Sequence, residues 1–250
     1  MTRSLTRTHF PSSRLIRILS DLALLDAAEP GAAFAEKLGL WVDYSDAIAL
    51  STALSTGSSG GRPAAQPRAT ALYEELASLR TSLENSIAQT ESTKSGKVRI
   101  ERPTPDFEFP VKVAAAYEPY RRYYAAHQRE MDSDIRQLRA TVRETLARTS
   151  PALKQLAALD AALDKVLVER ESKLLSKVPL LLKKRFEHFI KVHQQTLLDT
   201  DQADKPDTWM KEGSWLARFC HELEAVLLAE LDVRLQPTLG LIEALQNEKT

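Results

Sequence analysis

The sequence of 250 residues contains one cysteine, eight glycines and only 6% aromatic residues. Cys220 alone cannot form an internal disulfide, and a single free thiol suits a reducing compartment. β-Sandwiches and doubly wound α/β enzymes use glycine at many of their turns, so the scarcity of glycine argues against both classes. These absences favour a chain built mostly from helices.

Neither sign of charge is in excess, because 34 basic side chains balance 34 acidic ones. A neutral chain gives no whole-molecule electrostatic reason to bind nucleic acid or an anionic membrane. No run approaches the roughly 18–20 apolar residues that span a bilayer. Residues 1–11 are interpreted as a disordered basic tail rather than a signal peptide, because Arg17 and Asp21 would interrupt the apolar region. We expect a cytoplasmic protein without a transmembrane segment.

Residues 12–55 are predicted to form a small N-terminal helical region. Ser12 or Ser13 can cap a first helix that carries its apolar residues on one face, and a second helical stretch follows Pro30-Gly31. Three glycines and two prolines then make residues 56–68 a flexible linker.

Regular apolar spacing begins at about residue 69 and predicts a bundle of long helices over residues 69–250. Two stripes have the 4, 3, 4, 4 spacing typical of a coiled-coil seam: Leu72, Leu76, Leu79, Leu83 and Ile87; then Met131, Ile135, Leu138, Val142 and Leu146. The prolines and glycine within about 93–112 predict a loop between the stripes. Pro119 is expected in the first turn of the helix that carries the second stripe.

A further helix is predicted to begin at Ser150-Pro151, an N-cap followed by a proline at the first helical position. Its apolar stripe comprises Leu153, Leu156, Leu159, Leu163, Val166 and Leu167. Pro179 must kink or end this helix. A polar connection over Asp199–Thr208 precedes a last long helix, which Pro237 is expected to interrupt before a short helix ends near Asn247.

The fold class that follows is all-α, an elongated antiparallel helical bundle with coiled-coil-like packing. Acid-first charge pairs four residues apart agree with the stripes about which faces meet water: Glu118/Arg122, Asp132/Arg136, Glu144/Arg148 and Glu169/Lys173. We expect the leucines to be buried between neighbouring helices, which would leave no room between them for a reaction centre.

No motif in the sequence carries recognisable chemistry. His221-Glu222 begins like the helix of a zinc protease, but Ala225 stands where the second ligand would be. The glycines of residues 57–61 lack the Lys-Ser/Thr pair of a phosphate-binding loop. We therefore predict no catalytic residue, no metal site and no cofactor.

Two groups of aromatic and acidic residues are candidate partner-binding sites. The first is Trp41, Asp43, Tyr44 and Asp46, whose acids have helix capping as the alternative role. The second is Tyr120 and Tyr124, which share a helical face with Tyr117 if the helix extends back that far. The alternative for these tyrosines is packing beneath the loop that carries Phe107 and Phe109.

Charge is unevenly distributed near the C-terminus. Residues 165–193 hold eight basic and three acidic side chains, net +5, whereas residues 199–250 hold five basic and eleven acidic ones, net −6. These segments could pair within the chain or between copies of it. Alternatively, a set of cations could bind phosphates or anionic lipid: Lys173, Lys177, Lys183, Lys184 and Arg185.

Four strings resemble an uncharacterised proteobacterial family, domain of unknown function 3348: LIRILSDLALLD, FAEKLGLWVDYSDAIALSTAL, HQREMDSDIRQLRATVRETL and RLQPTLGLIEAL. The resemblance covers nearly the whole chain and carries no catalytic residues with it. It implies a bacterial, cytoplasmic, helical protein. Members of this family tend to be encoded near membrane proteins that look like motor stators and outer-membrane anchors, which implies an accessory of an envelope-associated complex.

The expected function is therefore that of a non-enzymatic helical interaction or scaffold protein that self-associates or docks onto helices of a protein partner. The alternative is a nucleic-acid or anionic-surface binder that uses residues 173–191. A third hypothesis is an enzyme with a site around Trp41, Asp43 and Asp46.

Overall fold

A computed structural model of the chain describes residues 13–22, 51, 65–88, 99–106, 112–201 and 203–248. It contains these elements: α1 (Arg14–Asp21), α4 (Ala65–Ala88), α5 (Val113–Thr149), α6 (Pro151–Leu175), α7 (Val178–Thr200), the short 3₁₀ helix η1 (Pro206–Thr208) and α8 (Trp215–Gln246). The described residues form helices and connections without a strand, which confirms the all-α fold class.

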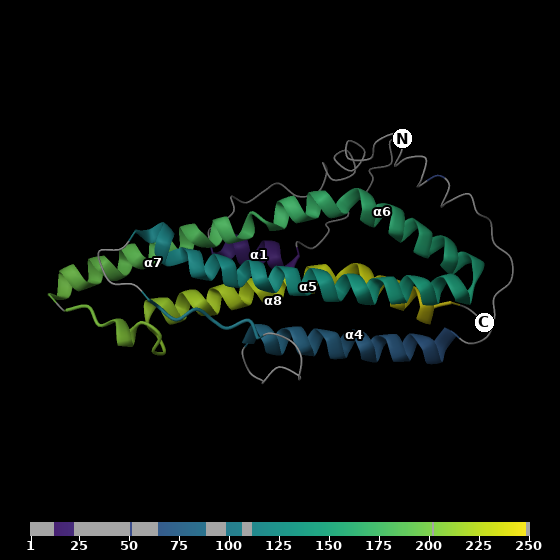
Figure 1. Cartoon of the computed structure of the whole chain (residues 1–250), viewed down its shortest axis with the longest axis horizontal. Helices are drawn as coiled ribbons and strands as arrows, with labels where there is room; N and C mark the ends of the chain where they lie inside the picture. Colours follow the sequence, from purple (N-terminus) through teal and green to yellow (C-terminus); the bar gives the residue numbers. More distant parts are fainter. Residues whose placement is uncertain are drawn as a thin grey trace, which may run out of the picture.

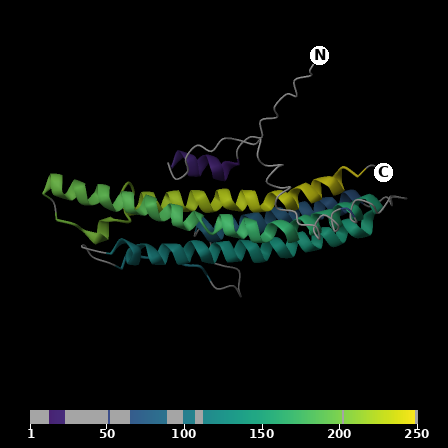
Figure 2. The same cartoon turned by 90° about the horizontal axis from the view of Figure 1, so that it is seen from above.

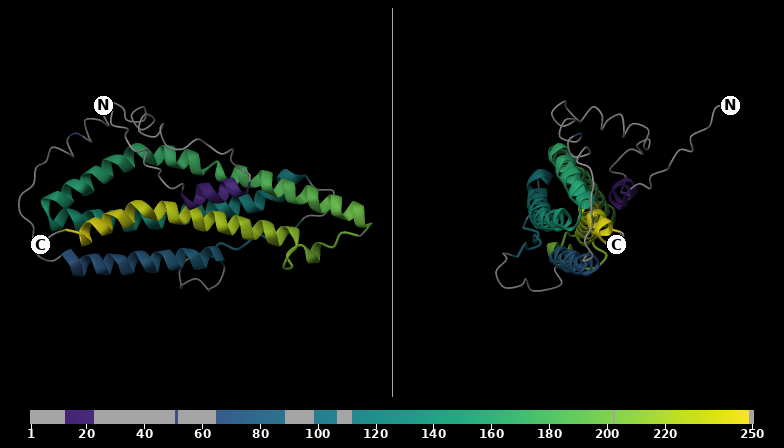
Figure 3. Two further views of the ribbon diagram at one scale, coloured as in Figure 1. Left: turned by 180° about the vertical axis from the view of Figure 1, so that it is seen from behind. Right: turned by 90° about the vertical axis from the view of Figure 1, so that its right-hand side faces the viewer.

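The long helices lie along a common axis (Figure 1). α5 and α8 run in the same direction and contact each other, while α4 and the successive helices α6 and α7 run in the opposite direction. α8 contacts α1, α4, α5, α6 and α7, and the end-on view in Figure 3 shows it among them. Figure 2 shows the short α1 on the side of α8 that faces away from α5.

The second predicted stripe is the best buried part of α5. Met131, Ile135, Leu138, Val142 and Leu146 all lie in the core, as the 4, 3, 4, 4 spacing predicted. On α4 the corresponding stripe is also buried, apart from Leu79, which is half-buried.

The stripe of α6 differs from the prediction. Leu153 is its only buried member, and the other five residues remain half-buried: Leu156, Leu159, Leu163, Val166 and Leu167. The cause is that α6 packs mainly on α5 and bows away from α8, as Figures 1 and 3 show. α8 therefore covers the leucines of α6 only in part.

Two predictions about prolines were wrong and two are confirmed. α5 begins at Val113, so Pro119 lies inside the helix, and α8 continues through Pro237 to Gln246. Both of these prolines are exposed, so water can reach the carbonyl groups that lose their helical partner. By contrast, α6 does start with a Ser150 cap, whose Oγ accepts the Leu153 amide proton at 3.2 Å, and the helix does end before Pro179.

The N-terminal predictions are only partly within the described residues. Ser13 caps α1 by accepting the amide proton of Ile16 at 3.3 Å. α4 begins at Ala65, inside the stretch that composition assigned to the linker, and Pro67 fits its first turn. The second predicted N-terminal helix, apart from Ser51, and residues 56–64 of the linker lie outside the described residues.

The α5–α6 hairpin is held in register by a cluster of four charged side chains. Arg139 binds Asp160 at 2.5 Å and Asp164 at 2.9 Å, and Arg143 binds the same two carboxylates at 2.6 and 2.9 Å. All four side chains are mostly shielded from solvent. The four contacts tie one turn of α5 to one turn of α6.

The outward position of Pro237 predicts a stabilising substitution. Pro237→Ala should restore the missing backbone hydrogen bond of α8 and raise the free energy of unfolding by about 1–3 kcal/mol, measured by urea denaturation. Pro151→Ala is the matched control, because proline at the first helical position costs no hydrogen bond. Equal changes in the free energy of unfolding for the two substitutions would show that Pro237 destabilises α8 no more than Pro151 destabilises α6.

Candidate functional site

The predicted partner-binding residues do not form an exposed site within the described chain. Trp41, Asp43, Tyr44 and Asp46 lie outside the described residues. Tyr120 and Tyr124 are 1% and 0% exposed, so their assignment to a partner surface was wrong. The physical reason is that α5 starts early enough to carry them into the core.

Tyr120 and its neighbour Tyr117 belong to an aromatic cluster between α5, α7 and α8. The rings of Tyr117 and Tyr120 both lie 5.5 Å from the ring of Phe186, and Phe219 lies 4.9 Å from Phe186. The shared face of Tyr117, Tyr120 and Tyr124 is confirmed. Phe107 and Phe109, the packing partners considered from sequence, lie outside the described residues.

Burial also shifts the acid–base properties of this cluster. It raises the pKa of the Cys220 thiol to about 11, and it raises the pKa of Tyr117 and Tyr120 well above their ordinary value. The thiol is therefore protonated and shielded at neutral pH. Cys220 is a packing residue in this structure.

A fully buried carboxylate, Glu230, lies beside the cluster. Its Oε2 accepts a hydrogen bond from the hydroxyl of Tyr124 at 2.7 Å, and the Gln128 amide donates to both carboxylate oxygens at 3.0 and 3.1 Å. Arg234 completes the shell, with its Nη2 at 2.8 Å from Oε1. A buried charge is tolerated when it is paired and hydrogen-bonded in this way.

The same side chains stabilise the break between α6 and α7. The amide of Gln128 also donates to the carbonyl of Leu175, the last residue of α6, at 3.1 Å. The hydroxyl of Tyr117 donates to the carbonyl of Pro179 at the start of α7. The Leu175 carbonyl therefore has a side-chain donor in place of the helical one that Pro179, which has no N–H, cannot supply. In the sequence, the one sign of this buried network is an acid, Glu230, within the apolar run VLLAEL.

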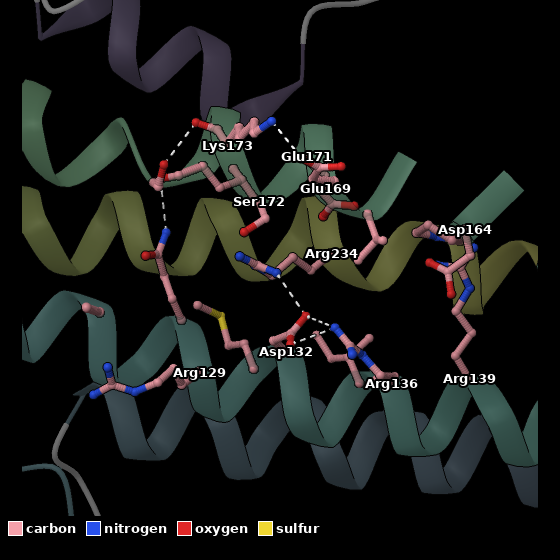
Figure 4. Close-up of a pocket in the computed structure, with 18 residues that line it drawn as sticks. Arg129, Asp132, Arg136, Arg139, Asp164, Glu169, Glu171, Ser172, Lys173 and Arg234 are labelled. Carbon is pink, nitrogen blue, oxygen red and sulfur yellow. Dashed lines mark hydrogen bonds and ion pairs between the residues drawn. The ribbon is translucent and has the colours of Figure 1, made fainter. Parts of the chain in front are cut away.

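A groove with a volume of about 660 Å³ lies between α5, α6 and α8, as Figure 4 shows. It contradicts the expectation that the helices would leave no room between them. The groove lies where α6 leaves α8, so it has the same cause as the half-buried stripe of α6. Met131, Ile135 and Leu175 contribute apolar surface to its lining.

Most charges in the groove are neutralised by other side chains of the chain. Figure 4 shows Asp132 between Arg136 and Arg234, and the Arg136 contact measures 2.8 Å. Lys173 binds Glu169 at 2.7 Å and, mainly through this hydrogen bond, lowers the pKa of that carboxyl. A carboxyl held ionised in this way is a poor general acid.

Three of the five predicted anion-binding residues are already engaged. Lys173 pairs with Glu169, and Lys183 lies 3.7 Å from Glu187. The guanidinium of Arg185 contacts Glu222 of α8 with two hydrogen bonds of 2.7 Å and lies 4.6 Å from the centre of the Phe189 ring. Their assignment to a free anion site is corrected, because neighbouring acids of this chain occupy them.

Lys177 and Lys184 remain, and neither forms an ion pair with a described residue. They belong to a surface that we call the outer face of α7, defined by Lys177, Leu180, Lys184, Lys191 and Leu198. Its three lysines recur every seven residues, so they line up along one side of the helix about 10.5 Å apart. Leu180 is 58% exposed and Leu198 is 77% exposed.

Exposed apolar side chains are also found elsewhere on α6 and α7. Seven large apolar side chains of the described chain are exposed, and five of them lie on α6 and α7: Val168, Leu174, Leu180, Val192 and Leu198. The edge of the bundle formed by α6 and α7 in Figure 1 therefore combines uncovered apolar groups with lysines.

The family of the chain can now be stated. The family model described as "Protein of unknown function (DUF3348)" matches residues 1–247. The chain belongs to this family. Comparisons with curated proteins and with solved structures gave no match. In the described part of the chain no helix is both long enough and apolar enough to cross a bilayer, and no group of three or more His, Cys, Asp or Glu side chains is arranged to hold a metal ion.

The shell around Glu230 predicts a large loss of stability on truncation. Glu230→Ala should lower the free energy of unfolding by about 3–5 kcal/mol, because Arg234 and the Tyr124 hydroxyl lose their buried acceptor. Urea denaturation measures the loss. Glu243→Ala on the exposed side of α8 is the control and should change stability by less than about 0.5 kcal/mol. Similar losses for both variants would mean that the network contributes nothing specific.

The shifted pKa of Cys220 predicts that stability falls in alkali. The unfolded thiol loses its proton near its ordinary pKa of 9.0, whereas the folded thiol keeps it up to about pH 11, so ionisation favours unfolding between these values. Urea midpoints should therefore fall from pH 9 to pH 10, and Cys220→Ala should show a shallower fall. Identical slopes for the two proteins would contradict a shifted thiol.

Proposed function

We propose that this protein is a non-enzymatic helical interaction protein, and that it docks a helix of another chain, or of a second copy, on the outer face of α7. The observation that carries the proposal is that five of the seven exposed large apolar side chains in the described part of the chain lie on α6 and α7, two of them, Leu180 and Leu198, on this face. Apolar groups left in water at one edge of an otherwise packed bundle favour covering by a partner.

The composition of the face supports a helix as the occupant. Lysine stems lie among leucines, and long cationic side chains can cover an apolar contact while keeping their charged ends in water. This arrangement is typical of positions that flank the seam between two helices.

The charges of the groove support a role without catalysis. Asp164 joins α6 to Arg139 of α5, whereas Asp132 and Glu169 each pair with a cation one turn along their own helix. Proton transfer would require an acid or base held within reach of a substrate at a suitable pKa.

A cytoplasmic location beside an envelope-associated complex is part of this proposal. It rests on the family resemblance, since an accessory protein needs a docking face and the outer face of α7 is suited to that task.

A second candidate function is binding to a phosphate-rich surface. It is favoured by three lysines of the outer face that form no ion pair with a described residue and follow one line along α7: Lys177, Lys184 and Lys191. Such binding would depend steeply on salt, because lysines that contact phosphates release bound counterions.

Photo-crosslinking in the native host tests the docking proposal. Benzoylphenylalanine at position 180 or 198 should give a discrete protein adduct, because both positions lie on the proposed contact. The matched control is position 148 on α5, where Arg148 is equally exposed but belongs to a charged face.

Adducts at position 148 as abundant as those at 180 and 198, or no protein adduct at 180 and 198, would contradict docking on α7. Nucleic-acid adducts that disappear as salt increases would support the second candidate instead.

A further inference from the structure

We infer that α7 pairs antiparallel with α7 of a second copy, about a twofold axis near residue 189. The inference rests on the proposed docking function and names its partner. The contact would use a line of eight residues, here called the α7 seam: Lys177, Leu180, Lys184, Glu187, Lys191, Gln194, Leu198 and Asp201.

Six residues of the α7 seam lie on one side of α7, and its two end members, Lys177 and Asp201, are the cap residues of the helix. The members of the seam alternate three and four residues apart, the spacing that keeps side chains on one face over six turns. Glu187 and Gln194 are half-buried and the other six residues are exposed. Leu182, Phe186 and Ile190, on a different side of α7, are fully buried in the core and anchor the helix, so the seam stays turned outward.

The seam complements itself when its direction is reversed. In the register centred on residue 189, Leu180 of one copy faces Leu198 of the other, and Lys177 faces Asp201. Near the axis Glu187 faces Lys191. Twofold symmetry makes each of these contacts twice, as in an isologous interface.

The remaining contact of this register pairs Lys184 with Gln194, so no like charge opposes that lysine. No two like charges stand directly opposite each other anywhere along the seam. The leucine pairs and the opposite-charge pairs therefore favour the same alignment.

Other alignments fail on the same residues. A parallel pair in register would place every charged residue of the seam against its own copy, which gives five like-charge contacts: Lys177, Lys184, Glu187, Lys191 and Asp201. Sliding the antiparallel pair by seven residues puts Leu180 against a lysine or Leu198 against a glutamate. Among these antiparallel alignments, only the register centred on residue 189 places Leu180 against Leu198.

A nucleic acid or lipid surface fits the seam less well. Phosphates would gain nothing from Leu180 and Leu198 and would be repelled by Glu187 and Asp201. The contact is also short, because the 23 residues of α7 span about 35 Å. We therefore expect a reversible dimer whose formation depends on protein concentration.

Disulfide trapping tests the register in the full chain. Leu180→Cys protein mixed with Leu198→Cys protein should form a crosslinked heterodimer under mild oxidation, because these positions face each other. Neither variant alone should crosslink, since equivalent positions then lie about 27 Å apart along the axis. Cys220 does not compete, because it is buried and its pKa is raised to about 11. Crosslinking of Leu180→Cys alone, or none in the mixture, would overturn the register.

A charge exchange tests the axis without any crosslink. Glu187→Lys should weaken dimerisation about tenfold, because symmetry creates two lysine–lysine contacts, and Glu187→Lys with Lys191→Glu should restore it. Sedimentation equilibrium measures the dissociation constant. Lys154→Glu on α6 is the matched control, since Lys154 is exposed and forms no ion pair with a described residue. Failure of the double exchange to restore the dimer would refute the pairing.

The two proposals fail separately. A chain that stays monomeric when purified, while positions 180 and 198 still crosslink to another protein in cells, would refute self-pairing and leave docking intact. Absence of both signals would refute both.

Discussion

The break between α6 and α7 is the constraint on which the rest of the structure depends. Pro179 cannot continue the helix that Ser150 starts, so hydrogen bonding is disturbed there inside the molecule. The side chains of Gln128 and Tyr117 donate to carbonyls on the two sides of the break, and Glu230 holds Gln128 in place. A buried carboxylate, costly by itself, is stable here because its partners surround it.

Because of this break, α6 and α7 pack differently against the rest of the bundle. α7 places Leu182, Phe186 and Ile190 against α5 and α8, so its rotation about its own axis is fixed by the core. α6 bows outward instead, which leaves its leucines half-buried and opens the groove toward Arg234. The outer face of α7 is thus a consequence of packing on the opposite side of the same helix.

Some charged side chains near the C-terminus pair within the chain, and others lie on the proposed docking face. The imbalance between residues 165–193 and residues 199–250 is partly satisfied within the chain, most clearly by Arg185 and Glu222. Acids of α8 also bind arginines of distant elements, since Asp232 contacts Arg14 and Arg80. Lys177, Lys184 and Lys191 of α7 form no ion pair with a described residue, and they flank the exposed leucines of the proposed docking face.

Much of the fold follows from the sequence because its rules are local. Leucine spacing fixes the buried face of α5, Ser150-Pro151 fixes the start of α6, and Pro179 fixes its end; all three depend on neighbours within a few residues. The tertiary structure alone decided which charges stay free, how far α6 stands from α8, and that Tyr124, Gln128 and Arg234 meet at Glu230. Tyr124 and Gln128 lie more than a hundred residues from Glu230 along the chain. Their meeting depends on how whole helices pack, a balance of many weak contacts that no short stretch of sequence encodes.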